Sequence, residues 1–333
     1  MFLPVDALGT AVSEFAFELA LCAHLEERRE WLLARQLGGG VAEPGGRVLD
    51  VVGVVPGPQF DDRVALTADA IPTAAIESAV GPGRARFPPE AFDCHPARAR
   101  RATERAIEAG FFEVERRNGR EYVRQVARYP DWIGRLVGIE NKPDLGRPGD
   151  LRKQLRTDVS LAVVDEAILA TESHVTRAHL NRLPDPVGVW RFDPDERTIE
   201  VIREPTPLPV DGAGIEPLDR RPGRTDLAVV TGAEKARARR RIAERAYGKG
   251  WRTFELPACR ACEPAAADGP TLPHCTWKGR LVDPERECGP TCAGHEPAPA
   301  PDVDLESERE RLTPWIADPT GRRRRQSGLD RFG

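Results

Sequence analysis

The chain has 333 residues, a length that allows two domains or one domain with an insertion. Its net charge of −4 excludes a globally basic surface, so any contact with nucleic acid must be local. The sequence has no apolar run of transmembrane length, and its first residues lack the basic segment of a signal peptide. We therefore expect a cytoplasmic protein.

The first part of the chain predicts a helix followed by two strands. Apolar residues at helical spacing predict a helix at about 12–29. Residues 31–37 predict a short strand that ends at a glycine cluster. Residues 47–55 predict an apolar strand, and this strand carries Asp50.

Residues 56–130 are too many for a loop and predict a folded insertion. A short helix is expected at 72–80 and a helix rich in Arg and Ala at 96–109. The Asn-Gly pair at 118–119, between two alternating segments, is a strong hairpin signal. Helices followed by a two-stranded hairpin resemble a winged helix-turn-helix.

Residues 96–129 contain nine Arg and five Glu, which gives a local charge of +4. The winged-helix resemblance implies a helix in the major groove of DNA and wing arginines near backbone phosphate. A structural or dimerising winged helix is the alternative. The arginines expected at DNA are Arg98, Arg101, Arg105, Arg116, Arg117 and Arg120.

The most informative stretch is an apolar run at 136–139 that ends in Glu140, Asn141 and Lys142. It predicts a buried strand, and Glu140 and Lys142, two residues apart, are expected on one face. A carboxylate and an ammonium there are costly unless they are paired or used. A lysine is notable because the chain has five Lys and 44 Arg. The alternative is a simple surface ion pair.

The next segment predicts a helix with Asp150 as its N-cap and Gln154 on its first turns. A strand at 166–171 and a short helix at 173–183 follow. A hairpin at 187–203 is expected to close the sheet.

An acidic residue on one strand, an E-x-K at the end of the next and a helix with Gln154 resemble the PD-(D/E)XK nuclease superfamily. The resemblance implies a restriction-endonuclease-like αβββαβ core and metal-dependent hydrolysis of DNA. Asp50 and Glu140 would hold Mg(II) or Mn(II). Lys142 would orient water or stabilise charge in the transition state, and Gln154 would position water or DNA backbone.

Many members of this superfamily place a further acidic residue on the first helix, which Glu14 or Glu18 would supply here. Two solvated helix glutamates are the alternative. The competing function is a non-catalytic DNA-binding regulator or adaptor on an inert nuclease-like core.

Beyond the core, the Pro- and Gly-rich residues 206–232 predict a linker. Residues 233–247 predict a strongly basic helix, which either follows phosphate or is solvated with internal ion pairs.

Five of the seven cysteines follow this helix, and in a reducing compartment such clustering favours a metal site. Zn(II) is the preferred metal. An iron–sulfur cluster is the alternative, because RecB-like nucleases with a similar core can carry one, with a distant N-terminal ligand that Cys22 would supply. The candidate ligands in the C-terminal part are Cys259, Cys262, Cys275, Cys288 and Cys292.

The tail at 297–333 is expected to be disordered. Gln326, Leu329 and Phe332 have the Q-x-x-L-x-x-F spacing that resembles the PCNA-interacting (PIP) box, which implies binding to a sliding clamp. A second aromatic residue is missing, because Gly333 stands in its place.

The predicted fold is thus α/β, with a restriction-endonuclease-like core at 1–55 and 131–205. A winged-helix-like subdomain is inserted at 56–130. A linker at 206–232, a basic helix with a Cys-rich metal-binding segment at 233–296 and a tail at 297–333 complete the predicted organisation.

Overall fold

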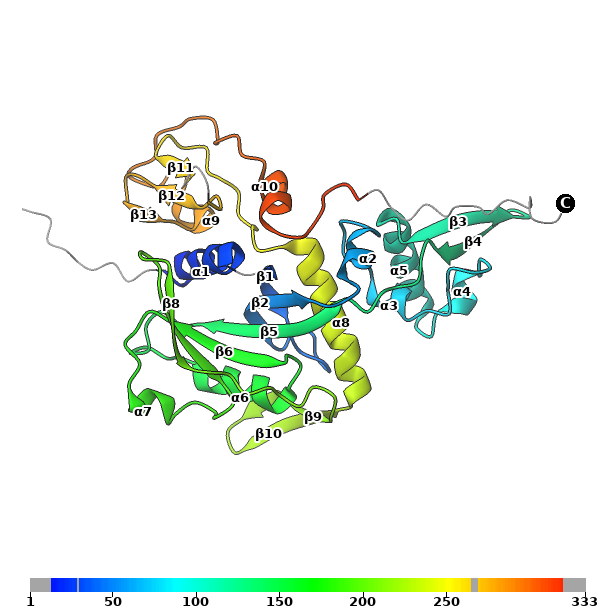
Figure 1. Cartoon of the computed structure of the whole chain (residues 1–333), viewed down its shortest axis with the longest axis horizontal. Helices are drawn as coiled ribbons and strands as arrows, with labels where there is room; N and C mark the ends of the chain where they lie inside the picture. The colour runs from blue at the N-terminus through cyan, green and yellow to red at the C-terminus, as the bar shows by residue number, and fades with distance from the viewer. Residues whose placement is uncertain (1–12, 29, 265–268, 320–333) are drawn as a thin grey trace, which may run out of the picture.

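A mixed six-stranded sheet forms the centre of the fold in the computed structural model, which describes residues 13–28, 30–264 and 269–319 (Figure 1). The strand order is β1-β2-β5-β6-β7-β8, and β5, β6 and β7 are parallel to one another. The remaining neighbours are antiparallel. The strands are β1 (Leu32–Gly38), β2 (Val48–Pro56), β5 (Ile133–Asn141), β6 (Glu166–Thr171), β7 (Gly188–Asp193) and β8 (Thr198–Arg203). The α/β class predicted from sequence is confirmed.

Helices cover both faces of this sheet because successive strand residues point to opposite sides. Leu33 and Val51 pack with α1 (Glu14–Arg28) on one face. On the other face, Leu32 and Val52 pack with α6 (Leu151–Leu161) and α8 (Gly232–Lys249). Helix α6 is also the crossover that the parallel pair β5 and β6 requires.

The insertion folds as a unit with its own apolar cluster, which includes Phe111 and Val123. Asn118 and Gly119 both have positive φ, as a two-residue hairpin turn of this kind requires, so the predicted hairpin is confirmed. Arg86 pairs with Val123 as an isolated bridge and extends the hairpin to a third segment. The elements are α2 (Phe60–Val64), α3 (Thr73–Ile76), α4 (Pro88–Ala91), α5 (Pro96–Glu108), β3 (Phe112–Arg117) and β4 (Arg120–Gln125).

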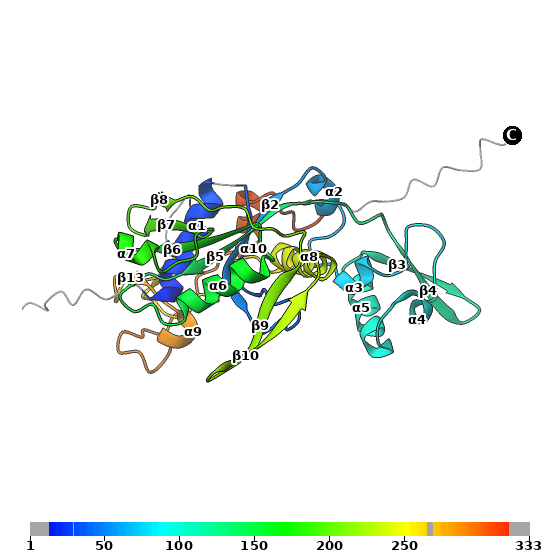
Figure 2. The ribbon, with the colours of Figure 1, turned by 90° about the horizontal axis from the view of Figure 1, so that it is seen from below.

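A buried ion pair fixes the base of the insertion to α8. The side chain of Arg63, fully buried, lies 2.7 Å from Glu244, which is 2 % exposed. Glu244 also accepts hydrogen bonds from Tyr129 Oη and from the Ile71 backbone N–H, each at 2.7 Å. The Arg63 guanidinium lies over the ring of Tyr247, 3.9 Å from its centroid. Figures 1 and 2 both show the insertion beside α8.

The linker predicted at 206–232 is wrong for most of its length. The structure has an antiparallel hairpin there, β9 (Gly214–Arg221) and β10 (Arg224–Val230). The Pro222–Gly223 pair makes its turn, with φ of 76° at Gly223. The buried Glu216 carboxylate accepts N–H bonds from Val41 at 2.9 Å and from Ala42 at 2.6 Å, which holds the hairpin against the β1–β2 loop.

Helix α8 begins at a Thr231–Glu234 capping box, so the helix predicted at 233–247 is confirmed. It is neither a solvated helix nor part of a separate C-terminal domain. Ala238, Ile242 and Ala246 belong to the core cluster, and the helix lies along β1. The sequence of this helix is rich in Ala and Arg, so its buried apolar face was not recognised from composition.

Disorder is also wrong for the described part of the tail, residues 297–319. Helix α10 (Leu305–Leu312) has Asp304 as its N-cap. Trp315 is 4 % exposed and donates from Nε1 to the Ala68 carbonyl at 3.0 Å, which anchors this segment. The PIP-like residues lie outside the described residues, so clamp binding stays a prediction.

Two predicted helix starts also differ in detail. The helix expected at 173–183 is α7 (Arg177–Leu180), and Thr176 caps it instead of Ser173. Asp150 precedes α6 as expected, but its side chain makes no capping hydrogen bond. Within the described ranges, no helix is both long and apolar enough to cross a membrane.

We predict that Glu244→Ala destabilises the fold by about 3–5 kcal/mol, because it leaves the buried Arg63 charge without its partner. Urea unfolding followed by circular dichroism measures this. Glu121→Ala is the matched control, since it breaks the exposed pair with Arg116 and should cost at most about 1 kcal/mol. Equal losses in the two variants would contradict the anchoring role of Glu244.

Candidate active site

Asp50 and Glu140 lie at the same end of two neighbouring strands. Val51 of β2 pairs with Ile139 of the antiparallel strand β5. Asp50 precedes Val51 and Glu140 follows Ile139, so the two acidic residues face each other across the strands. The Asn141 backbone N–H donates to Asp50 Oδ2 at 3.0 Å. The two acidic residues singled out in the sequence are therefore neighbours in space.

Helix α1 contributes a third carboxylate, that of Glu18, which is 4 % exposed. Asn141 Nδ2 and Gln36 Nε2 each donate to Glu18 Oε2 at 3.1 Å, and Arg35 forms a buried ion pair with it. Gln36 Nε2 also reaches Asp50 Oδ1 at 3.5 Å, which bridges the two acids. Of the two candidate glutamates on this helix, Glu18 is the one beside Asp50.

Glu14 has a different position. It is exposed and forms an ion pair with Lys142, which follows the end of β5. Glu140 instead contacts Arg47, so the two charged groups of the E-x-K segment bind different partners. The alternative of a simple Glu140–Lys142 surface ion pair is therefore wrong, because each charge has another partner among the described residues. Lys142 nevertheless remains at the rim of the site, partly exposed.

Glu140 is balanced by Arg47, at 2.5 Å from its Oε2. Arg47 also donates from Nε and Nη2 to Asp158 of α6, at 2.8 and 2.7 Å. Asp158 is one turn beyond Gln154 on this helix, and it is the α6 side chain that contacts the site. Gln154 is half-buried on the preceding turn.

Burial is the largest influence on the pKa of each of the three acids, and arginines or hydrogen bonds oppose it. Burial, with a smaller contribution from Asp50, raises the pKa of Glu140 to about 8 although Arg47 lowers it. Burial also raises the pKa of Glu18, and Asp50 again adds to the increase. The pKa of Asp50 itself is raised by burial, although the Asn141 N–H lowers it. Asp50 therefore lies near two other acids and, unlike them, forms no arginine ion pair among the described residues.

Sequence reasoning missed the side chains that organise these acids: Arg35, Gln36, Arg47 and Asp158. The sequence offered one signal for Arg47, namely its position at the start of the predicted strand, three residues before Asp50. Its burial is seen only in the structure. Gln36 has φ of 52°, and this unusual backbone at the end of β1 directs its amide to Glu18 and Asp50. A strand pattern cannot reveal such a turn.

These oxygens suit a hard divalent cation. The described residues contain no three His, Cys, Asp or Glu side chains arranged to hold a metal ion. Mg²⁺ needs no such cage, because one or two carboxylates with water and substrate phosphate are its usual ligands. Asn141 Oδ1 is buried and has no hydrogen-bond partner among the described residues. Asp50, Glu140 and this amide oxygen therefore fit Mg²⁺ in kind.

The predicted DNA-contacting arginines divide into two groups. Arg98, Arg101 and Arg105 are exposed on α5 and line a cleft toward α8. Arg116 and Arg117, on the hairpin, form ion pairs with Glu121 and Glu115. Arg120 lies over the Phe87 ring, 5.8 Å from its centroid.

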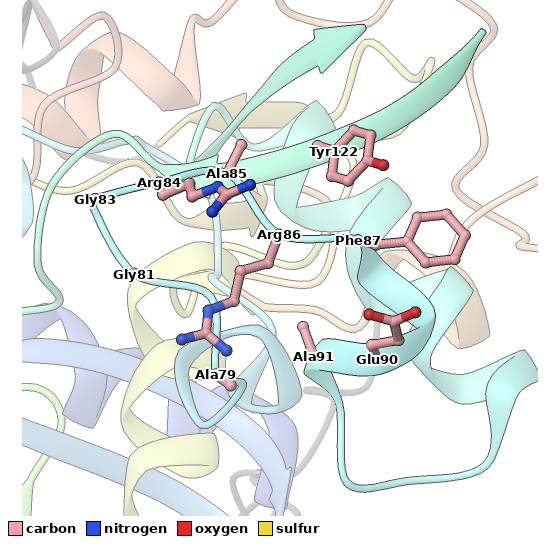
Figure 3. Close-up of a pocket in the computed structure, with 10 residues that line it drawn as sticks. All are labelled: Ala79, Gly81, Gly83, Arg84, Ala85, Arg86, Phe87, Glu90, Ala91 and Tyr122. Atoms are coloured by element: carbon pink, nitrogen blue, oxygen red, sulfur yellow. The ribbon is translucent and has the colours of Figure 1, made fainter. Parts of the chain in front are cut away.

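Another cavity, of about 500 Å³, lies inside the insertion. Figure 3 shows the Arg86 side chain extending toward Ala79, whereas Phe87 and Tyr122 lie on the other side. Glu90 is the acidic residue in its lining. None of the residues predicted for the active site lines this cavity, so it belongs to the insertion alone.

The Cys-rich segment forms a small sheet of β11 (Cys262–Pro264), β12 (Pro273–Cys275) and β13 (Arg280–Leu281), followed by α9 (Pro284–Glu287). Cys262 and Cys275 are cross-strand partners, and the Cys262 N–H donates to the Cys259 carbonyl at 3.0 Å. Burial, together with smaller effects of the nearby Cys288, Cys259 and Cys275, raises the pKa of Cys262 to about 11.

Cys22 is fully buried in the apolar layer between α1 and the sheet, as a small hydrophobic residue would be. The role of distant iron–sulfur ligand considered for Cys22 stays a prediction.

We predict that Asp50→Asn stabilises the metal-free protein by about 0.5–2 kcal/mol at neutral pH. The change removes the charge that repels Glu18 and Glu140, but it keeps an oxygen for the Asn141 N–H. Urea unfolding in the presence of EDTA measures it. Asp150→Asn removes an exposed carboxylate and should change stability by less than about 0.5 kcal/mol. Destabilisation by Asp50→Asn would show that the fold balances this charge.

One family pattern, described as a family of unknown function (DUF5787), matches residues 32–297. The match includes Asp50, Glu140 and the five C-terminal cysteines, and it begins after α1. No curated protein and no solved structure matches the chain. The chain belongs to the DUF5787 family, whose function is unknown.

Proposed function

We propose that this protein is a metal-dependent DNA nuclease with its active site at the ends of β2 and β5. The position of Asp50 between the carboxylates of Glu18 and Glu140 carries the proposal. Three neighbouring acids, among which Asp50 raises the pKa of the other two, lie beside a lysine. Such a group is typical of a cation site and costly without a function.

The order of elements supports this proposal. Helix α1, strands β1, β2 and β5, helix α6 and strand β6 follow the αβββαβ order of the PD-(D/E)XK core. The insertion separates β2 from β5 without breaking their pairing. In this proposal, Asp50 and Glu140 on the second and third core strands correspond to the metal ligands of that superfamily.

In this proposal, Asp50 and Glu140 hold Mg(II) or Mn(II), and the Asn141 amide oxygen supplies a third ligand. The bound metal would lower the pKa of a water molecule and neutralise charge on the phosphate. Lys142 stabilises negative charge on the phosphate oxygens. Arg35 and Gln36 hold Glu18 in place, and Arg47 fixes the orientation of Glu140.

The insertion fits a DNA-binding role in this proposal. The order α3, the Arg86 bridge, α4, α5 and the β3–β4 hairpin resembles that of a winged helix, which supports this role. Helix α5 would then be its DNA-facing helix, because Arg98, Arg101 and Arg105 have spacings of three and four residues and share a face. The wing arginines are partly neutralised by Glu115 and Glu121 and contribute less.

A non-catalytic DNA-binding protein is the second candidate, and two ion pairs favour it. Arg47 binds Glu140, and Glu14 binds Lys142, so both groups of the E-x-K segment have protein partners. An inert core would retain such pairs. Arg47 is shared with Asp158, however, and Glu14 is exposed, so neither pair closes the site.

We further propose that Cys259, Cys262, Cys275 and Cys288 bind a structural Zn(II). The cross-strand pairing of Cys262 with Cys275 and the turn at Cys259 gather these thiols, although no three of them are arranged as ligands in the described residues. A sliding clamp would tether the nuclease through Gln326, Leu329 and Phe332, which lie outside the described residues.

We predict that the wild-type protein cleaves end-labelled DNA with Mg(II) or Mn(II), and that Asp50→Ala lowers the rate by at least about 100-fold. The same variant should still bind DNA, because the basic side chains are intact. Denaturing gels measure cleavage and fluorescence anisotropy measures binding. Undiminished cleavage by Asp50→Ala would overturn the site, and DNA binding without cleavage by the wild type would favour the non-catalytic candidate.

We predict that the purified protein contains about one zinc per chain by elemental analysis. Cys262→Ser should lose the metal, because this thiol lies among the other three. Cys292→Ser is the matched control and should keep it. Iron in a coloured protein would favour the cluster, and retention of zinc by Cys262→Ser would contradict the proposed ligands.

A further inference from the structure

A cleft of about 1180 Å³ separates the insertion from the core, and arginines line both of its walls. Helix α5 contributes Arg98, Arg101 and Arg105, and α8 contributes Arg241 and Arg245. Figures 1 and 2 show α5 and α8 on facing sides of the junction. The cleft is therefore built from two elements that are far apart in sequence.

Acidic side chains also line the cleft, but the one that lies between Arg241 and Arg245 on α8, Glu244, already has a buried arginine as its partner. Glu244 is buried and bound to Arg63. Asp69, Glu104 and Glu108 are the others. Five arginines and four acidic residues line the cleft. Because Glu244 is paired with Arg63, which is not part of the lining, the remaining side chains give the cleft a net positive charge.

The positive charges concentrate around Arg241. Burial lowers the pKa of this guanidinium, and the neighbouring Arg245 and Arg98 lower it further, although Glu216 opposes them. Its Nε is buried and has no hydrogen-bond partner within the described ranges. Three guanidinium groups from two walls thus repel one another, and an anion between them would remove this repulsion.

The basic side chains of α8 continue from this cleft toward the carboxylate site. Arg241, Arg245 and Lys249 are each four residues apart and lie on one side of the helix. They span about 12 Å along its axis. Lys249 Nζ donates to the Arg35 carbonyl at 2.6 Å, and Arg35 holds Glu18. The row therefore ends at the residues that organise the acids.

We propose that the α5–α8 cleft and the row Arg241, Arg245 and Lys249 bind the sugar–phosphate backbone of DNA and lead it to the site at Asp50. Guanidinium groups suit this backbone because they form paired hydrogen bonds with phosphate. The row would contact about three to four phosphates of one strand if the strand runs along α8. The direction toward Asp50 rests on the proposed nuclease function, whereas the binding surface does not.

The test measures DNA binding by fluorescence anisotropy in EDTA, where no metal-dependent cleavage occurs. The probes are a fluorescein-labelled duplex, its single strand and an RNA of the same sequence. Arg98→Ala and Arg245→Ala are combined, because one exposed residue from each wall is then removed. Alanine is the best helix former, so both helices should remain folded, and a thermal melt verifies this.

The double variant should bind duplex DNA at least about tenfold more weakly. The slope of log affinity against log salt should fall by about 1.8, which corresponds to two lost phosphate contacts. The matched control, Arg221→Ala with Arg224→Ala, removes the same charge from the β9–β10 turn. The control should change affinity less than about twofold.

An unchanged affinity and salt slope in the double variant would overturn the proposal, as would an equal loss in the control. Tighter binding of RNA than of both DNA probes would also overturn it. If the double variant melts early, Arg98→Gln with Arg245→Gln repeats the test with longer side chains. If the cleft does not bind DNA, these variants keep the affinity of the wild type. If the nuclease proposal fails, the wild type binds DNA but does not cleave it when metal is present.

Discussion

Three acidic side chains gather at one end of the central sheet, and the protein has to balance their charge away from bulk water. Arg35 balances Glu18, and Arg47 balances Glu140. Asp50 accepts hydrogen bonds from the Asn141 N–H and the Gln36 amide, and Arg47 lowers its pKa, but it has no ion pair of its own among the described residues. Negative charge therefore remains at Asp50, which is where a cation would be stabilised most.

Helix α8 connects this site to the rest of the molecule. One side of the helix completes the core through Ile242 and Ala246, and Glu244 fixes the insertion to it. Another side presents Arg241 and Arg245 to the cleft. A single helix thus sets the position of the insertion relative to the carboxylates. A basic helix that seemed separate from the core in the sequence is its central support.

Local patterns predicted the parts of the fold that depend on local physics. Glu140 was singled out because a charge at the end of a buried strand is costly unless it is paired or used. Asp50 was singled out because the resembled superfamily carries an acid on the preceding strand. The Asn118–Gly119 turn was found because positive φ favours those residues. Glu216 contacts the β1–β2 loop and Trp315 contacts Ala68, and both contacts join segments that are distant in sequence. Local composition does not reveal such contacts, so it predicted a linker and a disordered tail instead. The same limitation hid Arg47 and Asp158.

Titration of the metal-free protein with Mn(II), followed by calorimetry, tests the central claim most directly. The account predicts saturable binding in the wild type that Asp50→Asn weakens at least about tenfold, because Asp50 holds the unbalanced charge. If the chelator removes zinc from the Cys-rich segment, its thiols could also bind Mn(II). Cys262→Ser is therefore titrated in parallel as the matched reference. Equal Mn(II) binding by the wild type and Asp50→Asn would contradict the account.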